Sequence, residues 1–407
     1  MCGINTNQSL STYWERGETD MAVDFRAGLE DVVAANSAIC DVDGRAGRLR
    51  YRGYDIADLA EHSSYEEVAY LLWNGDLPGK ATFAEFARSL AGQRAAPPAV
   101  LAAMERYPRA AHPLEALRSA VSLLAMYDPD VADNSPDANL RKSRRLTAQM
   151  GTLVAAWRRI REGKPAVSPD PALSHAADFL YMMTGAPPDP LAAEAMDAVL
   201  VLHAEHELNA STFVARVAVA TVSDMHSAVV AALGTLKGPR HGGANEDVLI
   251  MLEAIGPPEQ AEPYIRARLA TRAHMSHAER ADPRNRIPGW GHRVYKVDDP
   301  RAARLRAIGR RLAERAGLLP LFETAEIVYR VMKAETDLPV NVDYYSAVIY
   351  RALGIPSDFC TSIFAVARVA GWCAHIMEQY GDNRLIRPRA HYIGTAPRPF
   401  VPLEARL

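Results

Sequence analysis

The 407-residue sequence has few cysteines and no marked excess of one charge. Its four cysteines, Cys2, Cys40, Cys360 and Cys373, share no CxxC spacing, which argues against a zinc site and a disulfide framework and fits a reducing compartment. The 46 basic and 49 acidic residues give a net charge of -3, so no overall basic field favours nucleic acid or an anionic membrane. We expect a cytoplasmic protein that binds neither.

Long hydrophobic runs are also scarce. The first thirty residues contain no apolar run because charged residues interrupt the stretch, so we expect no secretory signal. The longest apolar stretch, 359–377, has Arg368 at its centre and His375 near its end. Polar groups at these positions predict a buried helix of a soluble protein rather than a membrane span.

What the sequence does contain is the pattern of a helical globular protein, with 49% apolar and 23% charged residues. Apolar residues recur at three-to-four spacing in several segments, including 68–73, 116–126, 192–203 and 227–236. Only the segment 39–54 resembles strands around a turn. Because the strand-helix alternation of a doubly wound sheet is missing, the sequence predicts an all-α fold.

The segment GPRHGGANE places His241 directly before a predicted helix over 244–255 that ends at Gly256. The positive end of the helix dipole disfavours an imidazolium, and a neutral ring can donate a hydrogen bond to a carbonyl that becomes an enolate. The two following glycines permit close backbone approach to a ligand. Taken alone, the motif favours a simple helix-entry turn over a catalytic histidine.

A second glycine-rich segment, PGWGHRVYK, presents His292. It is not a dinucleotide-binding loop, because Val294 stands where GxGxxG needs its third glycine and no strand precedes it. We predict a flexible loop in which Arg293, Lys296 and Arg301 favour a phosphate or carboxylate ligand. A solvated basic turn is the alternative.

Further candidates lie in the last quarter of the chain. Asp343 opens a predicted helix between Val342 and two tyrosines, so partial burial would raise its pKa towards that of a general base. A helix N-cap is the structural alternative for this residue. Arg368 lies in the apolar helix and needs an anionic partner, either a protein or a substrate carboxylate. Arg387 lies in an extended, proline-containing segment.

The segment HAEHELNAST holds His203 and His206 at a spacing of three, which places both on one helical face and could hold a metal. The HExxH and HxxEH patterns are absent and no third ligand is evident, so the spacing gives little support to a metal site.

Taken in order, these segments resemble the citrate synthase family, and the resemblance covers all but the first forty or so residues. It implies a nearly all-helical, two-domain homodimer with the active site in the cleft between the domains. Residues 1–238 and 347–407 would form the large domain, with 1–30 as an N-terminal extension, and 239–346 the small domain.

The resemblance implies condensation of acetyl-CoA with oxaloacetate, followed by hydrolysis to citrate and CoA, without a metal or redox cofactor. It assigns catalysis to His241, His292 and Asp343. It assigns oxaloacetate binding to His206, Arg301, Arg368 and Arg387, the last across the dimer interface. It assigns CoA binding to Arg286, Ile287, Gly289, Gly291, Arg293 and Lys296.

Two alternatives stay open at this point. The first is a 2-methylcitrate synthase that uses propionyl-CoA on the same scaffold. The resemblance to that group is weaker, because its loop usually has proline after the catalytic histidine, where this chain has Arg293. The second is a silent homologue that binds CoA or a carboxylate. The complete set of His241, His292 and Asp343 argues against it, since a binding protein needs no general base.

Overall fold

The computed structural model describes residues 26–406, except for the side chains of residues 277, 281 and 283. These residues divide into a helical body, Ser37–Ile386, and a second unit made of the terminal segments 26–36 and 387–406. Most of the predicted N-terminal extension, 1–30, and also Cys2 lie outside the described residues.

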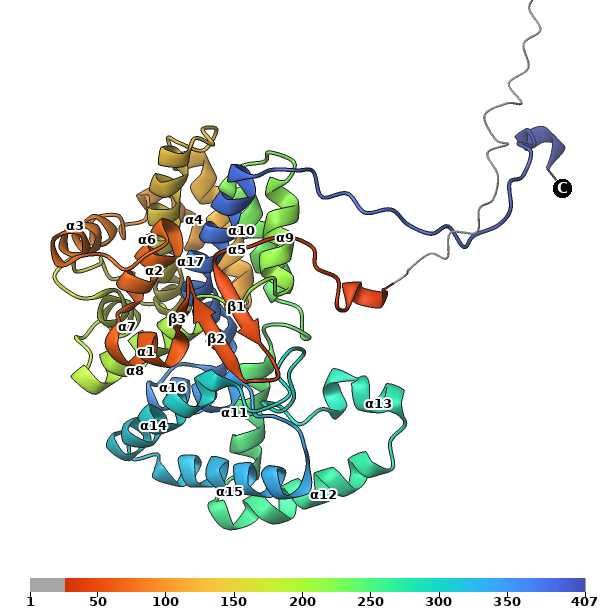
Figure 1. Cartoon of the computed structure of the whole chain (residues 1–407). Coiled ribbons are helices and arrows are strands. Elements are labelled where there is room, and N and C mark those ends of the chain that lie inside the picture. Colours follow the sequence, from red (N-terminus) through yellow and green to blue (C-terminus); the bar gives the residue numbers. More distant parts are fainter. Residues whose placement is uncertain (1–25, 407) are drawn as a thin grey trace, which may run out of the picture. The chain divides into compact units, whose positions relative to one another are not determined.

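The body confirms the predicted all-α fold and contains two groups of helices (Figure 1). The buried helix α17 (Cys360–Gly381) is central to the first group, where it packs against α2, α6, α8, α9 and α10. The other members are α1 (Ile56–His62), α2 (Tyr65–Asn74), α3 (Lys80–Ala91), α4 (Pro98–Met104), α5 (Pro113–Leu124), α6 (Pro136–Arg161), α7 (His175–Thr184), α8 (Pro190–His203), α9 (Ala210–Val219) and α10 (Met225–Leu236).

The second group lies between α10 and α17 in the sequence and below the first group in Figure 1. In it α16 packs against α11 and α14, and α12 packs against α15. Its members are α11 (Ala244–Ile255), α12 (Ala261–Ala273), α13 (His277–Ala281), α14 (Pro300–Arg315), α15 (Leu319–Glu335) and α16 (Val342–Ala352). α14 also contacts α1 and α8, and α16 extends past the predicted boundary at residue 346. The domain division itself stays a prediction.

The helices begin where side chains cap them. Ser64 accepts the N–H of Glu67, and the Glu67 carboxylate accepts the N–H of Ser64, which forms a capping box at the start of α2. The predicted helix 244–255 has the observed bounds of α11 and ends at Gly256. Each of the other three-to-four patterns also lies in a helix, because its apolar face is buried in one continuous core.

The segment 39–54 forms a small antiparallel sheet of β1 (Cys40–Asp43), β2 (Arg48–Tyr51) and β3 (Tyr54–Asp55), with Cys40 opposite Tyr51. The tip of this hairpin lies against the loop that follows His292. The N–H of Lys296 donates to the carbonyl of Gly44 over 2.8 Å. A Cβ at Gly44 would lie within 3.0 Å of the Val294 carbonyl, so this contact requires glycine.

The segment Ser357–Gly381, which contains α17, is long and apolar enough to cross a membrane, and its most apolar window is entirely buried in the protein. This confirms the predicted buried helix. Core helices of globular proteins have the same composition, so the apolar stretch is explained by packing.

The terminal unit has little regular structure, with short 3₁₀ turns at Ala27–Leu29 and Leu403–Ala405. Large apolar side chains in its C-terminal segment are exposed: Tyr392, Ile393, Phe400 and Leu403. Arg387 belongs to this unit.

Candidate active site

Most of the predicted site residues come together in the body. The rings of His206 and His292 lie 5.3 Å apart, edge to face. The charges of Arg301 and Arg368 both lower the pKa of Asp343, and Arg368 also lowers that of His241. Side chains from both helix groups therefore form one electrostatically connected cluster.

His241 lies in the turn between α10 and α11, and Ser211 fixes which of its nitrogens carries the proton. The backbone N–H of Ser211 donates to Nε2 of His241 over 3.3 Å, and the Ser211 hydroxyl lies 2.8 Å from the same nitrogen. Because Nε2 accepts, Nδ1 carries the proton of the neutral ring. Burial lowers the pKa of His241 to about 4, with a smaller contribution from Arg368. At neutral pH the ring is therefore an uncharged donor, and the cause is burial, where the sequence suggested the helix dipole.

Gly242 allows a close contact within the protein. A Cβ at this position would lie within 3.0 Å of the Leu236 carbonyl and of the Thr361 side chain, and the Thr361 hydroxyl donates to the Gly242 carbonyl over 2.7 Å. Whether this glycine also makes room for a ligand stays a prediction. It lets the turn carrying His241 rest on α17.

His292 is fixed in the opposite tautomer. Its Nδ1 accepts the N–H groups of Val294 and Tyr295, each over 3.0 Å. The proton of the neutral ring is therefore on Nε2. Burial, followed by the charge of Arg301, lowers the pKa of His292 to about 4. His292 can therefore donate through Nε2 at neutral pH.

Gly289 and Gly291, which precede His292, form hydrogen bonds with the segment just before α16, the helix that carries Asp343. The Gly291 N–H donates to the Pro339 carbonyl over 2.8 Å, and the Asn341 N–H donates to the Gly289 carbonyl over 3.0 Å. Gly289 has a φ of +80°, and a Cβ there would lie 2.5 Å from Tyr344. Where the sequence suggested a flexible loop, the glycines permit a close fit to the segment preceding α16.

Asp343 is the second residue of α16, and the suggestion that it caps this helix is wrong. The cap is Asn341, whose side chain accepts the Asp343 N–H over 3.1 Å. Burial raises the pKa of Asp343 to about 7, against the opposing effects of Arg301, Arg368 and a hydrogen bond from Asn245. A carboxyl group with this pKa is matched to proton abstraction near neutral pH.

Arg301, in the first turn of α14, is held by Asp299. Its Nε lies 2.9 Å from Oδ1 of Asp299 and its Nη2 lies 2.7 Å from Oδ2. Asp299 also caps the helix by accepting the Arg301 N–H over 3.0 Å. Asp299 was not among the predicted site residues, although the Asp-Pro-Arg order is a common helix start. Both side chains are buried, so one edge of the guanidinium is already neutralised within the protein.

Arg368 is 1% exposed, and its Nε donates to the His203 carbonyl over 2.6 Å. Burial lowers its pKa, and among the charges that oppose this effect the largest contribution is from Glu205. Among the described residues no carboxylate forms an ion pair with Arg368. Its guanidinium is therefore less fully neutralised than that of Arg301.

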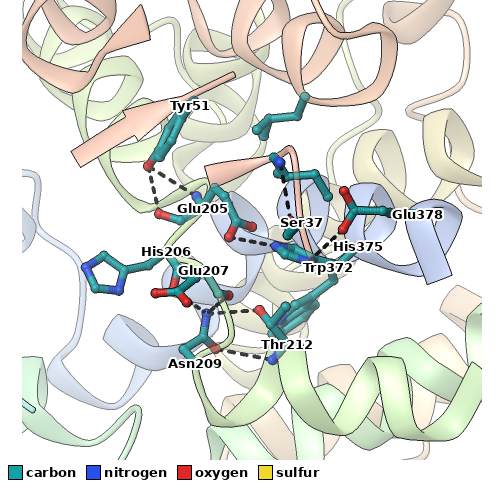
Figure 2. A network of polar contacts seen from close by, with 12 residues as sticks. Ser37, Tyr51, Glu205, His206, Glu207, Asn209, Thr212, Trp372, His375 and Glu378 are labelled. Carbon is teal, nitrogen blue, oxygen red and sulfur yellow. Dashed lines mark hydrogen bonds and ion pairs between the residues drawn. The ribbon is translucent and has the colours of Figure 1, made fainter. Parts of the chain in front are cut away.

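His206 follows α8 in the turn 204–209 and is buried. Its Nε2 lies 3.2 Å from the Tyr295 hydroxyl, a partner that the sequence analysis missed. Figure 2 shows that its ring points away from the side chain of Glu205. His203, at the end of α8, instead makes a 2.8 Å hydrogen bond with the Val199 carbonyl. Among the side chains that the structure describes, no group of three metal-ligating residues occurs.

The residues expected to bind CoA differ in exposure. Ile287 is 3% exposed and supports the core. Arg286, Arg293 and Lys296 are exposed, and Lys296 lines an open groove of about 570 Å³ together with Gly47 and Lys333. Such a surface suits a solvated phosphate ligand better than a buried one.

Comparison with known proteins identifies the family. The family model "Citrate synthase, C-terminal domain" matches residues 28–389. The chain belongs to the citrate synthase family. It is 47% identical over 380 residues to "Citrate synthase 2" of Bacillus subtilis, covering 93% of this chain and 98% of that protein. It is 44% identical over 393 residues to the citrate synthase of Haloferax volcanii, covering 95% and 100%.

Solved structures of the family share the fold. The citrate synthase of Pyrobaculum aerophilum matches with a TM-score of 0.85 and 38% identity, covering 93% of this chain and 95% of that chain. A ternary complex of the Thermoplasma acidophilum enzyme with carboxymethyl coenzyme A and oxaloacetate matches with a TM-score of 0.85 and 32% identity, covering 93% and 99%. Family relatives named 2-methylcitrate synthase are less similar, at 36% to 38% identity. Membership makes this protein an enzyme, a transferase acting on acyl groups.

Proposed function

We propose that the enzyme condenses acetyl-CoA with oxaloacetate and hydrolyses the product to citrate and CoA. The observation that supports this most directly is the complementary set of three side chains. Two neutral histidines have their protons fixed on opposite ring nitrogens, and a carboxyl group with a pKa of about 7 lies in the same cluster.

Proton removal from the acetyl methyl group is assigned to Asp343. Its carboxylate takes the proton while the C–H electron pair forms the enol double bond. The thioester oxygen receives a hydrogen bond from Nδ1–H of His241, so negative charge does not accumulate on it. A base with a pKa near 7 combines sufficient basicity with a substantial ionised fraction at neutral pH.

Carbon–carbon bond formation is assigned to His292. Its Nε2–H donates to the ketone oxygen of oxaloacetate while the enol carbon attacks the polarised carbonyl carbon. The C=O electron pair moves to that oxygen, which takes the proton and becomes the hydroxyl of citryl-CoA. Water then attacks the thioester of the resulting citryl-CoA, and CoA leaves as the thiol. Atoms and electrons balance without net oxidation or reduction, so the proposed sequence needs no redox cofactor.

The carboxylates of oxaloacetate are assigned to His206, Arg301 and Arg368. Guanidinium groups match the geometry of carboxylates, and a substrate carboxylate would supply the anion that Arg368 otherwise lacks. Arg293 and Lys296 are assigned to CoA phosphates because both are exposed cations on the segment after His292.

We further propose that the enzyme is a homodimer in which Arg387 completes the site of the partner subunit. The exposed apolar side chains at 392–403 support this proposal, because such residues are normally covered by another surface. A two-fold axis would make the exchange of the two C-terminal segments reciprocal.

The test is a comparison of kcat/KM for acetyl-CoA and propionyl-CoA with oxaloacetate, following release of the CoA thiol. We expect acetyl-CoA to be preferred. A preference for propionyl-CoA would identify a 2-methylcitrate synthase instead. Absence of turnover with either substrate, together with retained CoA binding, would favour the silent homologue.

A further inference from the structure

The turn between α8 and α9 presents His206 on a strained backbone. Glu207, the next residue, has a φ of +52°, in the left-handed region that non-glycine residues seldom adopt. Such a conformation persists only where surrounding contacts hold it. The contacts on either side of Glu207 should therefore determine where the His206 ring points.

Both ends of the turn are anchored by hydrogen bonds (Figure 2). On one side the Tyr51 hydroxyl donates to the Glu205 carbonyl over 2.8 Å. On the other side the Asn209 side chain donates to the carbonyls of His206 and Glu207, each over 3.4 Å. The bond from Tyr51 to Glu205 is shorter than either bond from Asn209. The turn is therefore anchored more firmly at Glu205 than at its other end.

The Glu205 side chain continues this anchor into the core. Its Oε1 lies 3.0 Å from Nε2 of His375 in α17, and both side chains are fully buried. Nη1 of Arg216 donates to Nδ1 of His375 over 3.0 Å, so the imidazole proton is on Nε2 and is donated to the carboxylate. Arg216 is held in turn by Gln379, over 3.0 Å, and by Glu378, over 2.6 Å.

The turn also lies directly on the backbone of α17. A Cβ at Gly371 would lie within 3.0 Å of Oε2 of Glu205 and of the Ala204 carbonyl. The Glu205 charge faces Arg368 as well, since it is the largest charge effect raising the pKa of that arginine. One buried carboxylate thus connects the His206 turn, Arg368 and His375.

We propose that Glu205 and His375 are positioning residues for oxaloacetate binding, because their hydrogen bond holds the strained turn that presents His206. The inference rests on the proposed function, since it concerns the substrate assigned to that site. Neither residue contacts the reacting atoms. The alternative is a buried pair that contributes to stability alone.

The decisive variant is Glu205→Gln, which keeps the shape of the side chain and removes its charge. We expect the KM and the calorimetric Kd for oxaloacetate to rise by about tenfold, the effect of weakening one charge-assisted hydrogen bond, while the KM for acetyl-CoA changes little. His375→Gln retains a donor for Glu205 and an acceptor for Arg216, and should preserve the oxaloacetate KM. The matched control is Asp178→Asn, which neutralises the carboxylate of another buried pair, 3.1 Å from Arg94.

A variant that folds easily provides an independent test. Glu207→Gly removes the cost of the positive φ and should raise Tm, as Val222→Gly should at an exposed residue with a φ of +67°. Only Glu207→Gly should also raise the oxaloacetate KM, because the turn would no longer be confined to one conformation. Faster hydrogen exchange of residues 204–209 in this variant would support the same conclusion.

Unchanged oxaloacetate affinity in both Glu205→Gln and Glu207→Gly would overturn the inference, as would equal losses in Glu205→Gln and the Asp178→Asn control. Failure of the proposed function can be distinguished from failure of this inference. A wild-type enzyme that forms no citrate would refute it, while calorimetric binding of oxaloacetate to the same variants would still test the positioning role.

Discussion

The hydroxyl of Ser211 lies 2.8 Å from Nε2 of His241, thirty residues further along the chain. The same hydroxyl accepts a hydrogen bond from the Trp372 indole over 3.2 Å and lies 2.8 Å from Oδ1 of Asn209. Ser211 therefore connects a proposed catalytic histidine to α17 and to the start of α9.

Ser211→Ala should lower kcat by about tenfold and leave the KM for oxaloacetate nearly unchanged, because one hydrogen bond that orients His241 is lost. The Ser211 N–H would still favour the Nδ1–H tautomer, so activity should not disappear. Steady-state kinetics on both substrates checks this expectation. Ser143→Ala is the control, since its hydroxyl is buried and donates to the Asn139 carbonyl over 2.8 Å. A kcat loss of equal size in both variants would show a general effect of buried hydroxyls.

Asp343→Asn should lower kcat by at least about a hundredfold, because the amide cannot accept the methyl proton. In the wild type, kcat/KM for acetyl-CoA should fall as the pH drops below about 7, the pKa to which burial raises this carboxyl. Isothermal calorimetry should find oxaloacetate binding largely intact in the variant. Turnover close to that of the wild type would remove Asp343 from the mechanism.

The same substitution should stabilise the protein at alkaline pH. The folded pKa of Asp343 is raised above its unfolded value of 3.8, so the folded state binds the proton more tightly. The stabilisation due to this group is present below pH 3.8 and is lost as the pH rises towards 7. Asp343→Asn removes the ionisation, so its Tm advantage over the wild type should be larger at pH 8 than at pH 5. Equal differences at both pH values would contradict the raised pKa.

Gly44→Ala, in the turn between β1 and β2, should impair catalysis by displacing the loop that follows His292. The added Cβ would displace the Val294 carbonyl, two residues after His292, and small displacements of reacting groups can lower kcat by about a hundredfold. Gly79→Ala is the control, because nothing lies within 4 Å of a Cβ there. Thermal melts establish whether both variants fold. Wild-type kcat in a folded Gly44→Ala protein would show that the hairpin tip does not position the His292 loop.

Features that depend on residues close together in the sequence could be predicted, whereas contacts between residues far apart in the sequence could not. α11, which has one apolar face, and α17, which is apolar on all sides, were visible because their patterns are local. The Asp299–Arg301 pair was also within reach, since it lies in one helix start. The Ser211–His241 contact joins separate elements whose distance only the folded chain determines. The same holds for the Tyr295 hydroxyl beside His206, because a phenol next to a glycine-rich loop has no distinctive sequence pattern.

Glycines were the least predictable residues for the same reason. The sequence showed that Gly242 and Gly289 stand near the candidate histidines, but not what approaches them. In the structure their neighbours are Leu236 and Tyr344, which come from other elements. Close approach to the protein itself and close approach to a ligand require the same residue, so sequence alone does not separate them.

The remaining prediction concerns the cross-subunit role of Arg387. Asp343→Asn and Arg387→Ala subunits should each be nearly inactive alone, because each homodimer lacks an essential group in both sites. In a heterodimer one site receives Asp343 from one subunit and Arg387 from the other, while the second site carries both lesions. Activity after subunit exchange should therefore rise clearly above that of either parent, towards half the wild-type value in each heterodimer. Tagged subunits purified in sequence would verify the heterodimer. No recovery in verified heterodimers would place Arg387 in the site of its own subunit, or outside the site altogether.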